Sequence, residues 1–145
     1  MIDKGKISQE PFIEILKILE EAETANLVDW NAMNIASVDQ MNQPSSRMVL
    51  LKKISDDGLV FYTNYNSRKG KEIELNPKVA VNFWWRELKK QIRVEGVIEK
   101  ASEEDSDEYF YSRPLKSRVS AIISNQSSKI SSYEDLTNQI DNYLE

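Results

Sequence analysis

The sequence predicts a mainly β, antiparallel domain, a barrel or a sandwich, with helices on either side of it in the chain. Two observations lead to this prediction. Short runs rich in Val, Ile, Phe, Tyr and Trp fill the middle of the chain, and tight turns separate them. Before and after these runs the apolar residues recur at helical spacing instead. Strands joined by tight turns favour antiparallel pairing, because a parallel pair needs a long crossover connection.

The first element expected is a helix over about residues 9–26. Its apolar side chains recur at helical spacing between Phe12 and Leu19. Pro11 suits the first turn, where a missing N–H leaves no hydrogen bond unmade. Ser8 is the expected N-cap.

A barrel or sandwich region is predicted over about residues 30–100. Its five expected strands cover residues 33–39, 47–54, 59–64, 78–85 and 91–99. The clearest turns are Asn42–Pro44 and Asp56–Gly58, and Glu87–Lys90 forms a further polar connection. A short helix over Arg68–Leu75 interrupts the strands.

A helical segment is predicted over about residues 102–145. Its expected helix starts are Ser102 with Asp105, Pro114, and Ser131 with Glu134. The last helix, from Tyr133 to Glu145, keeps its apolar residues at helical spacing. The 145 residues fit a single domain that can bury a core of its own.

Composition excludes several classes of protein. The chain is 40% hydrophobic and 30% charged, which is not typical of a disordered or membrane-spanning segment. Its net charge of −5 argues against a general nucleic-acid binder. It contains no cysteine and no histidine, which excludes disulfides, thiolate nucleophiles, histidine-based triads and zinc sites built on these residues. We therefore expect a cytoplasmic protein with no metal site, whose chemistry depends on an organic cofactor.

Three basic clusters suggest a site that binds anions. They are Arg47 with Lys52 and Lys53, Arg68 with Lys69 and Lys71, and Arg113 with Lys116 and Arg118. Arginine can hold a phosphate through two N–H groups, and lysine adds a point charge. Ser67 precedes Arg68 where a helix begins, so free backbone N–H groups could join these side chains. The alternative is a solvated basic surface, the commoner fate of such clusters.

The spacing of Arg47 and Lys52 refines this hypothesis. Five positions apart on an ideal strand, they face opposite sides of the sheet. Either one of them points away from the site, or the two serve different anions.

Two other patterns were weighed and disfavoured. Phe83–Arg86, followed by further basic residues, resembles an aromatic and basic surface for single-stranded nucleic acid, but aromatic strand residues are more often core or interface. The acidic residues between Glu103 and Glu108 could hold a cation, but acidic residues in a first helical turn usually interact with the helix dipole.

Five motifs in order resemble the pyridoxamine 5′-phosphate oxidase family. They are RMVLLK (47–52), VFYTNYNSRKGKEIELNP (60–77), QIRVEG (91–96), EYFYSRP (108–114) and NQSSKI (125–130). The resemblance extends from about Asp29 to Ile130. It implies an FMN-binding split β-barrel, antiparallel and Greek-key-like, that forms a homodimer, and we expect the Trp84–Trp85 strand to contribute to the buried surface.

The resemblance also implies the roles of individual residues. The FMN contacts would be Arg47, Met48, Val49, Leu50, Leu51, Lys52, Tyr62, Thr63, Arg68, Lys69, Gln91, Gln126 and Ser127. The substrate phosphate would be held by Lys52, Tyr109, Arg113 and Ser117. Asp29 matches a carboxylate near the substrate. No side chain is assigned a catalytic role, because the flavin carries the chemistry.

The implied reaction is the oxidation of pyridoxine or pyridoxamine 5′-phosphate by oxygen to pyridoxal 5′-phosphate and hydrogen peroxide. The family's C-terminal segment, with a tryptophan, an arginine and an Arg-Leu-His stretch, has no counterpart in these 145 residues. The alternative is therefore a truncated protein that binds flavin or pyridoxal phosphate with little oxidase activity. A general flavin reductase is disfavoured, because the four substrate-phosphate residues are all present.

Overall fold

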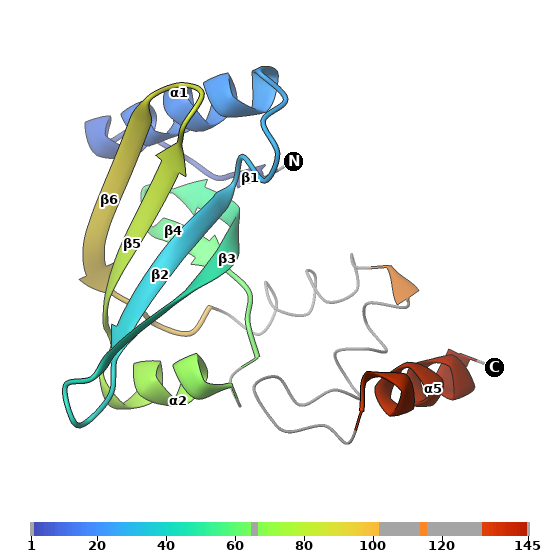
Figure 1. Cartoon of the computed structure of the whole chain (residues 1–145). Coiled ribbons are helices and arrows are strands. Elements are labelled where there is room, and N and C mark those ends of the chain that lie inside the picture. The colour runs from blue at the N-terminus through green and yellow to red at the C-terminus, as the bar shows by residue number, and fades with distance from the viewer. Residues whose placement is uncertain (1, 65–66, 102–113, 116–131, 145) are drawn as a thin grey trace. The chain divides into compact units, whose positions relative to one another are not determined.

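The computed structural model describes residues 2–64, 67–101, 114–115 and 132–144 (Figure 1). The chain divides into two compact units. One comprises Met1–Thr63 with Glu72–Glu99 and contains the sheet, and the other comprises Asn64–Lys71 with Lys100–Glu145. The single domain expected from the length stays a prediction.

A six-stranded sheet forms the first unit (Figure 1). Its strands are β1 (Asp3–Lys4), β2 (Ala32–Val38), β3 (Pro44–Ser55), β4 (Gly58–Phe61), β5 (Lys78–Trp85) and β6 (Lys90–Val97). The strand order is β1-β3-β2-β5-β6, and β4 pairs with β3. All pairs are antiparallel except β1 with β3. The predicted class, a mainly β antiparallel fold with flanking helices, is confirmed, and no pairing among the described residues closes the sheet.

Strand β3 is long enough to serve two sets of neighbours. Its first part, Pro44–Leu50, pairs with the whole of β2. Its second part pairs with both β4 and β1. Between Leu51 and Lys53 the register against β4 shifts, which marks a β-bulge or irregularity. A bulge bends a strand and interrupts the regular alternation of its side chains, so β3 changes its facing at this point.

The hairpin turns lie close to where the sequence predicts them. Asp56 and Asp57 connect β3 to β4, and Gly58 has a φ of +140°, which an L side chain rarely adopts. The turn between β2 and β3 closes on Asp39, whose Oδ1 accepts the amides of Met41 and Gln43 at 2.8 and 2.9 Å. The predicted strands are confirmed with shifts of a few residues, except that β4 ends at Phe61 and β1 was not predicted.

Three helices are described: α1 (Glu10–Thr24), α2 (Arg68–Leu75) and α5 (Tyr133–Leu144). The prediction that Ser8 caps α1 is wrong, because Gln9 holds the N-cap position and Ser8 hydrogen bonds to Asp56 instead. At α5 the hydroxyl of Ser132 accepts the amide of Asp135 at 3.0 Å, so the cap is one residue later than predicted. The other predicted helix starts, at Ser102 and Pro114, depend on segments outside the described residues.

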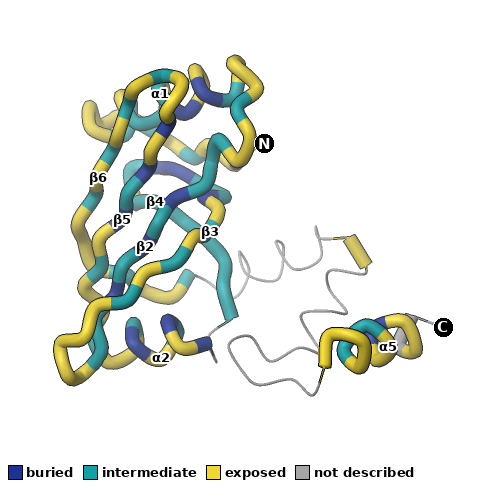
Figure 2. The backbone as a smooth tube through the Cα atoms, in the orientation of Figure 1, coloured by how far each residue is buried: buried dark blue, intermediate teal, exposed yellow. Residues whose placement is uncertain are grey.

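The core lies between α1 and one face of the sheet (Figure 2). Buried and partly exposed residues alternate along β2, as expected for a strand with one face against the core. The rings of Phe83 and Trp85 stack with centroids 5.4 Å apart, and the Trp85 indole donates to the carbonyl of Trp30 at 2.7 Å. Ion pairs from Lys4 to Glu20 and from Lys90 to Glu21 attach α1 to β1 and β6.

Within the described part of the chain, a search for helices long and apolar enough to cross a membrane finds none.

Candidate functional site

Arg47 lies on the inner face of the first part of β3. Along this strand Ser45, Arg47 and Val49 are partly buried, whereas Met48 and Leu50, which alternate with them, are exposed. The alternation follows from the pleat of a strand, which sends successive side chains to opposite faces. The first residues of the RMVLLK motif (47–52) therefore supply two different surfaces.

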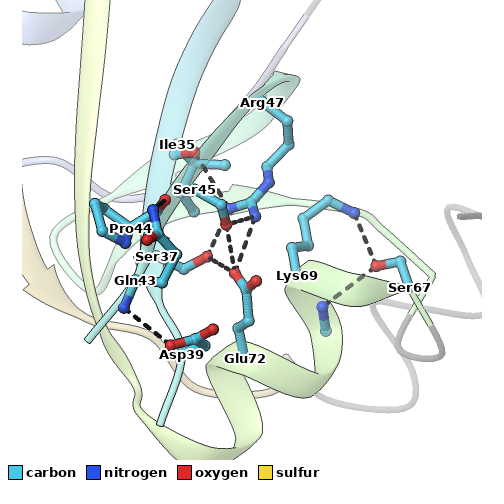
Figure 3. A network of polar contacts seen from close by, with 11 residues as sticks. Ile35, Ser37, Asp39, Gln43, Pro44, Ser45, Arg47, Ser67, Lys69 and Glu72 are labelled. Carbon is cyan, nitrogen blue, oxygen red and sulfur yellow. Dashed lines mark hydrogen bonds and ion pairs between the residues drawn. The ribbon is translucent and has the colours of Figure 1, made fainter. Parts of the chain in front are cut away.

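The Arg47 guanidinium is held by polar groups from three elements (Figure 3). Its Nη1 donates to the hydroxyl of Ser37 on β2 at 2.6 Å and to the carbonyl of Ile35 at 3.4 Å. Its Nη2 donates to the hydroxyl of Ser45 at 2.6 Å and to Oε2 of Glu72 on α2 at 3.1 Å. The arginine side chain is 20% exposed, so the cluster is screened from most of the solvent.

The two serines connect the arginine to the carboxylate. Ser37 and Ser45 donate their hydroxyl protons to Oε2 of Glu72 at 2.6 and 2.7 Å, and each accepts an N–H from Arg47. Each hydroxyl thus uses its donor toward the negative group and a lone pair toward the positive group. We call Ser37, Ser45, Arg47 and Glu72 the arginine cluster.

The hydrogen-bond count of Arg47 decides what it can offer a ligand. Nη1 and Nη2 carry four hydrogens, and four protein acceptors face them. The Nε–H makes no hydrogen bond to any described residue. Bidentate hydrogen bonding of an anion by Nη1 and Nη2 would therefore displace some of these protein acceptors.

Lys69, at the start of α2, is a buried cation. Its residue is 6% exposed, and its Nζ donates to the hydroxyl of Ser67 at 3.1 Å (Figure 3). Ser67 is buried too, and its hydroxyl also accepts the amide of Gly70 at 3.3 Å, which makes it the N-cap of α2. The next residue, Arg68, is exposed. The predicted helix start at this basic cluster is confirmed.

The outer face of the sheet carries exposed apolar side chains beside amides. Met48 and Leu50 on β3 and Trp84 on β5 are the exposed large apolar residues of these strands. On β6, Gln91 is exposed and pairs in register with Trp84, and its Nε2 donates to Oδ1 of Asn82 at 2.7 Å. Met48, Leu50 and Gln91 on this surface are predicted flavin contacts. Arg47 lies on the opposite face of the sheet.

Apart from Leu51, whose side chain is buried in the core, the remaining described residues of the predicted site are half-buried or exposed. Lys52 follows the buried Leu51 at the bulge of β3, and Tyr62 and Thr63 follow the end of β4. Because the bulge interrupts the alternation, the argument that Arg47 and Lys52 must face opposite sides does not hold. Asp29 has a φ of +50°, and its carbonyl accepts the amide of Ala32, so it has a role in a turn.

Five residues of the predicted site lie outside the described residues. They are Tyr109, Arg113, Ser117, Gln126 and Ser127. Their assignment stays a prediction. No group of acidic side chains among the residues described is placed to hold a metal ion.

The sequence reasoning did not identify Ser37 and Glu72 as parts of the site. A signal was present at Ser37, because it takes the third inward position on β2 after Met33 and Ile35, where an apolar residue is expected. Glu72 lies within the recognised KGKEIEL helix, but nothing in its spacing indicates a partner 25 residues earlier.

The open, mainly antiparallel sheet with a helix across its core face is a split-barrel-like fold, and the comparisons agree. The sequence profile of pyridoxamine 5′-phosphate oxidase matches residues 19–140. The chain belongs to the pyridoxamine 5′-phosphate oxidase family.

Relatives named pyridoxine/pyridoxamine 5′-phosphate oxidase support this membership. The one from Nostoc sp. PCC 7120 is 49% identical over 138 residues, which cover 95% of this chain and 64% of that protein. The one from Burkholderia thailandensis is 47% identical, over 90% of this chain and 61% of its own length. The chain thus spans less than two thirds of these relatives.

Solved structures share the fold. PhzG from Burkholderia lata, crystallised with tetrahydrophenazine-1-carboxylic acid, matches with a TM-score of 0.89 and 26% identity, over 94% of this chain and 68% of PhzG. A pyridoxamine 5′-phosphate oxidase-related, FMN-binding protein from Nostoc punctiforme matches with a TM-score of 0.71 and 14% identity, over 93% of this chain and 73% of its own.

Proposed function

We propose that this chain binds FMN and serves the oxidation of pyridoxine or pyridoxamine 5′-phosphate to pyridoxal 5′-phosphate. Membership of the family and 49% identity to a relative with that name support the proposal. Among the described residues, the observation that carries it is that the cationic side chains of Arg47 and Lys69 are largely withdrawn from solvent, each fixed by serine hydroxyls. Burying a cation is unfavourable, and charged groups held in this way are candidates for a functional site.

The family resemblance assigns residues of this chain to the two ends of FMN. Arg47 and Lys69 are proposed for its phosphate, because Arg and Lys side chains form charge-assisted hydrogen bonds to phosphate oxygens. The exposed side chains of Met48 and Leu50 suit an apolar ring, and the amide of Gln91 suits its polar edge. The remaining contacts proposed from the family resemblance are Val49, Leu51, Lys52, Tyr62, Thr63, Arg68, Gln126 and Ser127. When bound, FMN supplies a two-electron acceptor that oxygen can reoxidise.

The substrate phosphate is proposed to bind Lys52, Tyr109, Arg113 and Ser117. The reaction balances with oxygen as the final oxidant. Pyridoxine phosphate and O₂ give pyridoxal phosphate and H₂O₂, and pyridoxamine phosphate consumes one water as well and releases ammonia. The task of the protein is to hold both phosphates so that the flavin and substrate rings meet in a reactive orientation. Holding them in this way lowers the entropic part of the activation free energy.

A second candidate is a protein that binds flavin or pyridoxal phosphate but oxidises these substrates poorly. The observation that favours it is that these 145 residues contain no histidine to match the substrate-side histidine of the family. We further propose that the chain forms a homodimer to which the strand with Trp84 contributes, because this large apolar side chain is exposed.

The experiment that tests the proposal begins with the colour of the purified 145-residue chain. Flavin released by denaturation is identified by chromatography against FMN, FAD and riboflavin standards, and we expect FMN. Peroxide release is then measured with pyridoxine and pyridoxamine phosphates and with their unphosphorylated forms as controls. Turnover of the phosphorylated forms supports the oxidase, and bound FMN without turnover supports the second candidate. A chain with no affinity for FMN would contradict both.

A further inference from the structure

The arginine cluster contains one cation and one anion, both withdrawn from solvent. Glu72 is only 5% exposed, and its Oε2 accepts hydrogen bonds from Ser37, Ser45 and Arg47. A carboxylate so deeply buried needs such partners, because the loss of its hydration is costly. The formal charges of Arg47 and Glu72 cancel, so the pair as a whole is neutral.

Neutrality changes what Arg47 can contribute to anion binding. Phosphate is attracted by net positive charge, and Glu72 opposes this attraction at 3.1 Å from the guanidinium. A carboxylate in this place weakens the attraction, so it needs another reason to be there. Its contacts supply one: Glu72 and the two serines determine the plane in which the guanidinium lies and the N–H groups that remain available.

We propose that Glu72 is a positioning residue for phosphate recognition, which acts through Arg47. The carboxylate and the hydroxyls of Ser37 and Ser45 hold the Nη1 and Nη2 hydrogens, so that the guanidinium presents its remaining N–H in one fixed direction. The side chain is then already ordered before the ligand arrives, which lowers the entropic cost of binding. This inference rests on the proposed function, in which Arg47 binds the FMN phosphate.

The measured quantity is the phosphate preference, the ratio of the dissociation constant of riboflavin to that of FMN. The two ligands share the ring system and differ in the phosphate, so a general loss of stability or a damaged ring site affects both alike. Only a change in how the protein binds the phosphate group alters the ratio of the two dissociation constants. Both constants are obtained for the full chain from the quenching of flavin fluorescence.

We expect Glu72→Ala to lower the phosphate preference by about tenfold, as is typical for the loss of one member of a hydrogen-bonded network. Glu72→Gln keeps an acceptor for the serines and the guanidinium and removes the repelling charge. Its preference should therefore equal or exceed that of the unmodified chain. The matched control is Glu74→Ala, which removes an exposed carboxylate from the same helix and should leave the ratio unchanged.

A double variant tests whether Glu72 acts through Arg47. If it does, Arg47→Ala lowers the preference, and adding Glu72→Ala lowers it no further. Additive effects of the two substitutions would overturn the inference. So would a Glu72→Ala variant that keeps the phosphate preference of the unmodified chain when Arg47→Ala has lost that preference.

The failure of the proposed function gives different results. If the unmodified chain binds riboflavin as tightly as FMN, the FMN assignment fails as a whole. If the chain prefers FMN but Arg47→Ala retains that preference, the role of Arg47 fails, and with it that of Glu72.

Discussion

The hydroxyl of Ser8 donates to the carboxylate of Asp56 at 2.5 Å, across 48 residues of sequence. The amides of Ser8 and Gln9 donate to the same carboxylate at 2.9 and 3.0 Å. Asp56 lies in the turn between β3 and β4, so this contact attaches the start of α1 to the sheet. The hydrogen bond from the Ser8 hydroxyl, followed by those from the two amides, holds the pKa of Asp56 below its usual value of 3.8.

Asp56 should make the stability of the protein sensitive to acid. Because its pKa is lower in the folded protein, its contribution is complete above its ordinary pKa and is lost as the pH falls toward the folded pKa. We expect Asp56→Asn to lower the melting temperature near neutral pH. Between about pH 5 and about pH 3, the melting temperature of this variant should fall less than that of the unmodified protein. Circular dichroism melts at several pH values measure both effects. The control is Asp57→Asn in the same turn, and an acid dependence identical in Asp56→Asn and the unmodified protein would refute this role.

Two methionines test the core against the surface. Met33 on β2 is 1% exposed, whereas Met41 in the following turn is 87% exposed. Met33→Ala removes buried methylene and sulfur atoms and should lower the free energy of unfolding by about 2–5 kcal/mol. Met41→Ala should change it by less than about 0.5 kcal/mol. Urea denaturation measures both, and equal values would contradict the described core.

Lys69 should contribute strongly to FMN affinity. Losing a buried charged donor to the phosphate should weaken binding by about 1.5–3 kcal/mol in Lys69→Ala. Lys71→Ala is the matched control, because Lys71 is an exposed lysine on the same helix. Isothermal titration with FMN gives both affinities. Tight retention of FMN by the Arg47→Ala, Lys69→Ala double variant would exclude both residues from the phosphate site.

Trp84 should be part of the proposed dimer interface. It is 59% exposed, and large exposed apolar side chains favour association. We expect the unmodified chain to be a dimer by light scattering and Trp84→Glu to shift it toward monomer. Met41→Glu serves as control, since it adds the same charge at an exposed residue in a turn. A monomeric unmodified protein with FMN bound would contradict the interface.

The neighbouring tryptophan narrows the prediction of a dimer surface. The strand with Trp84 and Trp85 was expected to contribute to that surface, and within this strand Trp85 is buried and hydrogen bonds to the carbonyl of Trp30. Adjacent residues on a strand face opposite sides, so only one of them is available on the outer face.

Elements with a local signal could be predicted, and contacts between distant residues could not. The period of apolar residues and the turn residues gave β5 and α2 with the observed bounds. The two-residue strand β1 has too few residues for any period, and it exists because β3 offers it an edge. Ser8 has the residue type of a cap, but a better partner, Asp56, is near it only in the folded chain.

The same distinction holds for the candidate site: residues with a local signal could be predicted, and their distant partners could not. The basic residues and the resemblance identified Arg47 and Lys69, because arginine and lysine next to turns are visible in the sequence. The partners of Arg47 come from two other elements, and their convergence depends on the pairing of β2 with β3 and on the placement of Glu72. The bulge after Leu51 likewise has no sequence signal that we recognised.

The double pairing of β3 has a consequence for how the protein opens. One part of this strand is bonded to β2 and the other to β4 and β1, so no single neighbour can detach and free the whole strand. The amide protons of its second part, which has neighbours on both sides, are therefore expected to exchange with deuterated solvent late, whereas those of β6 at the edge exchange through local fraying. Arg47 lies on the first part, where β2 is the single neighbour among the described residues, so the segment that carries it can open while the second part stays paired.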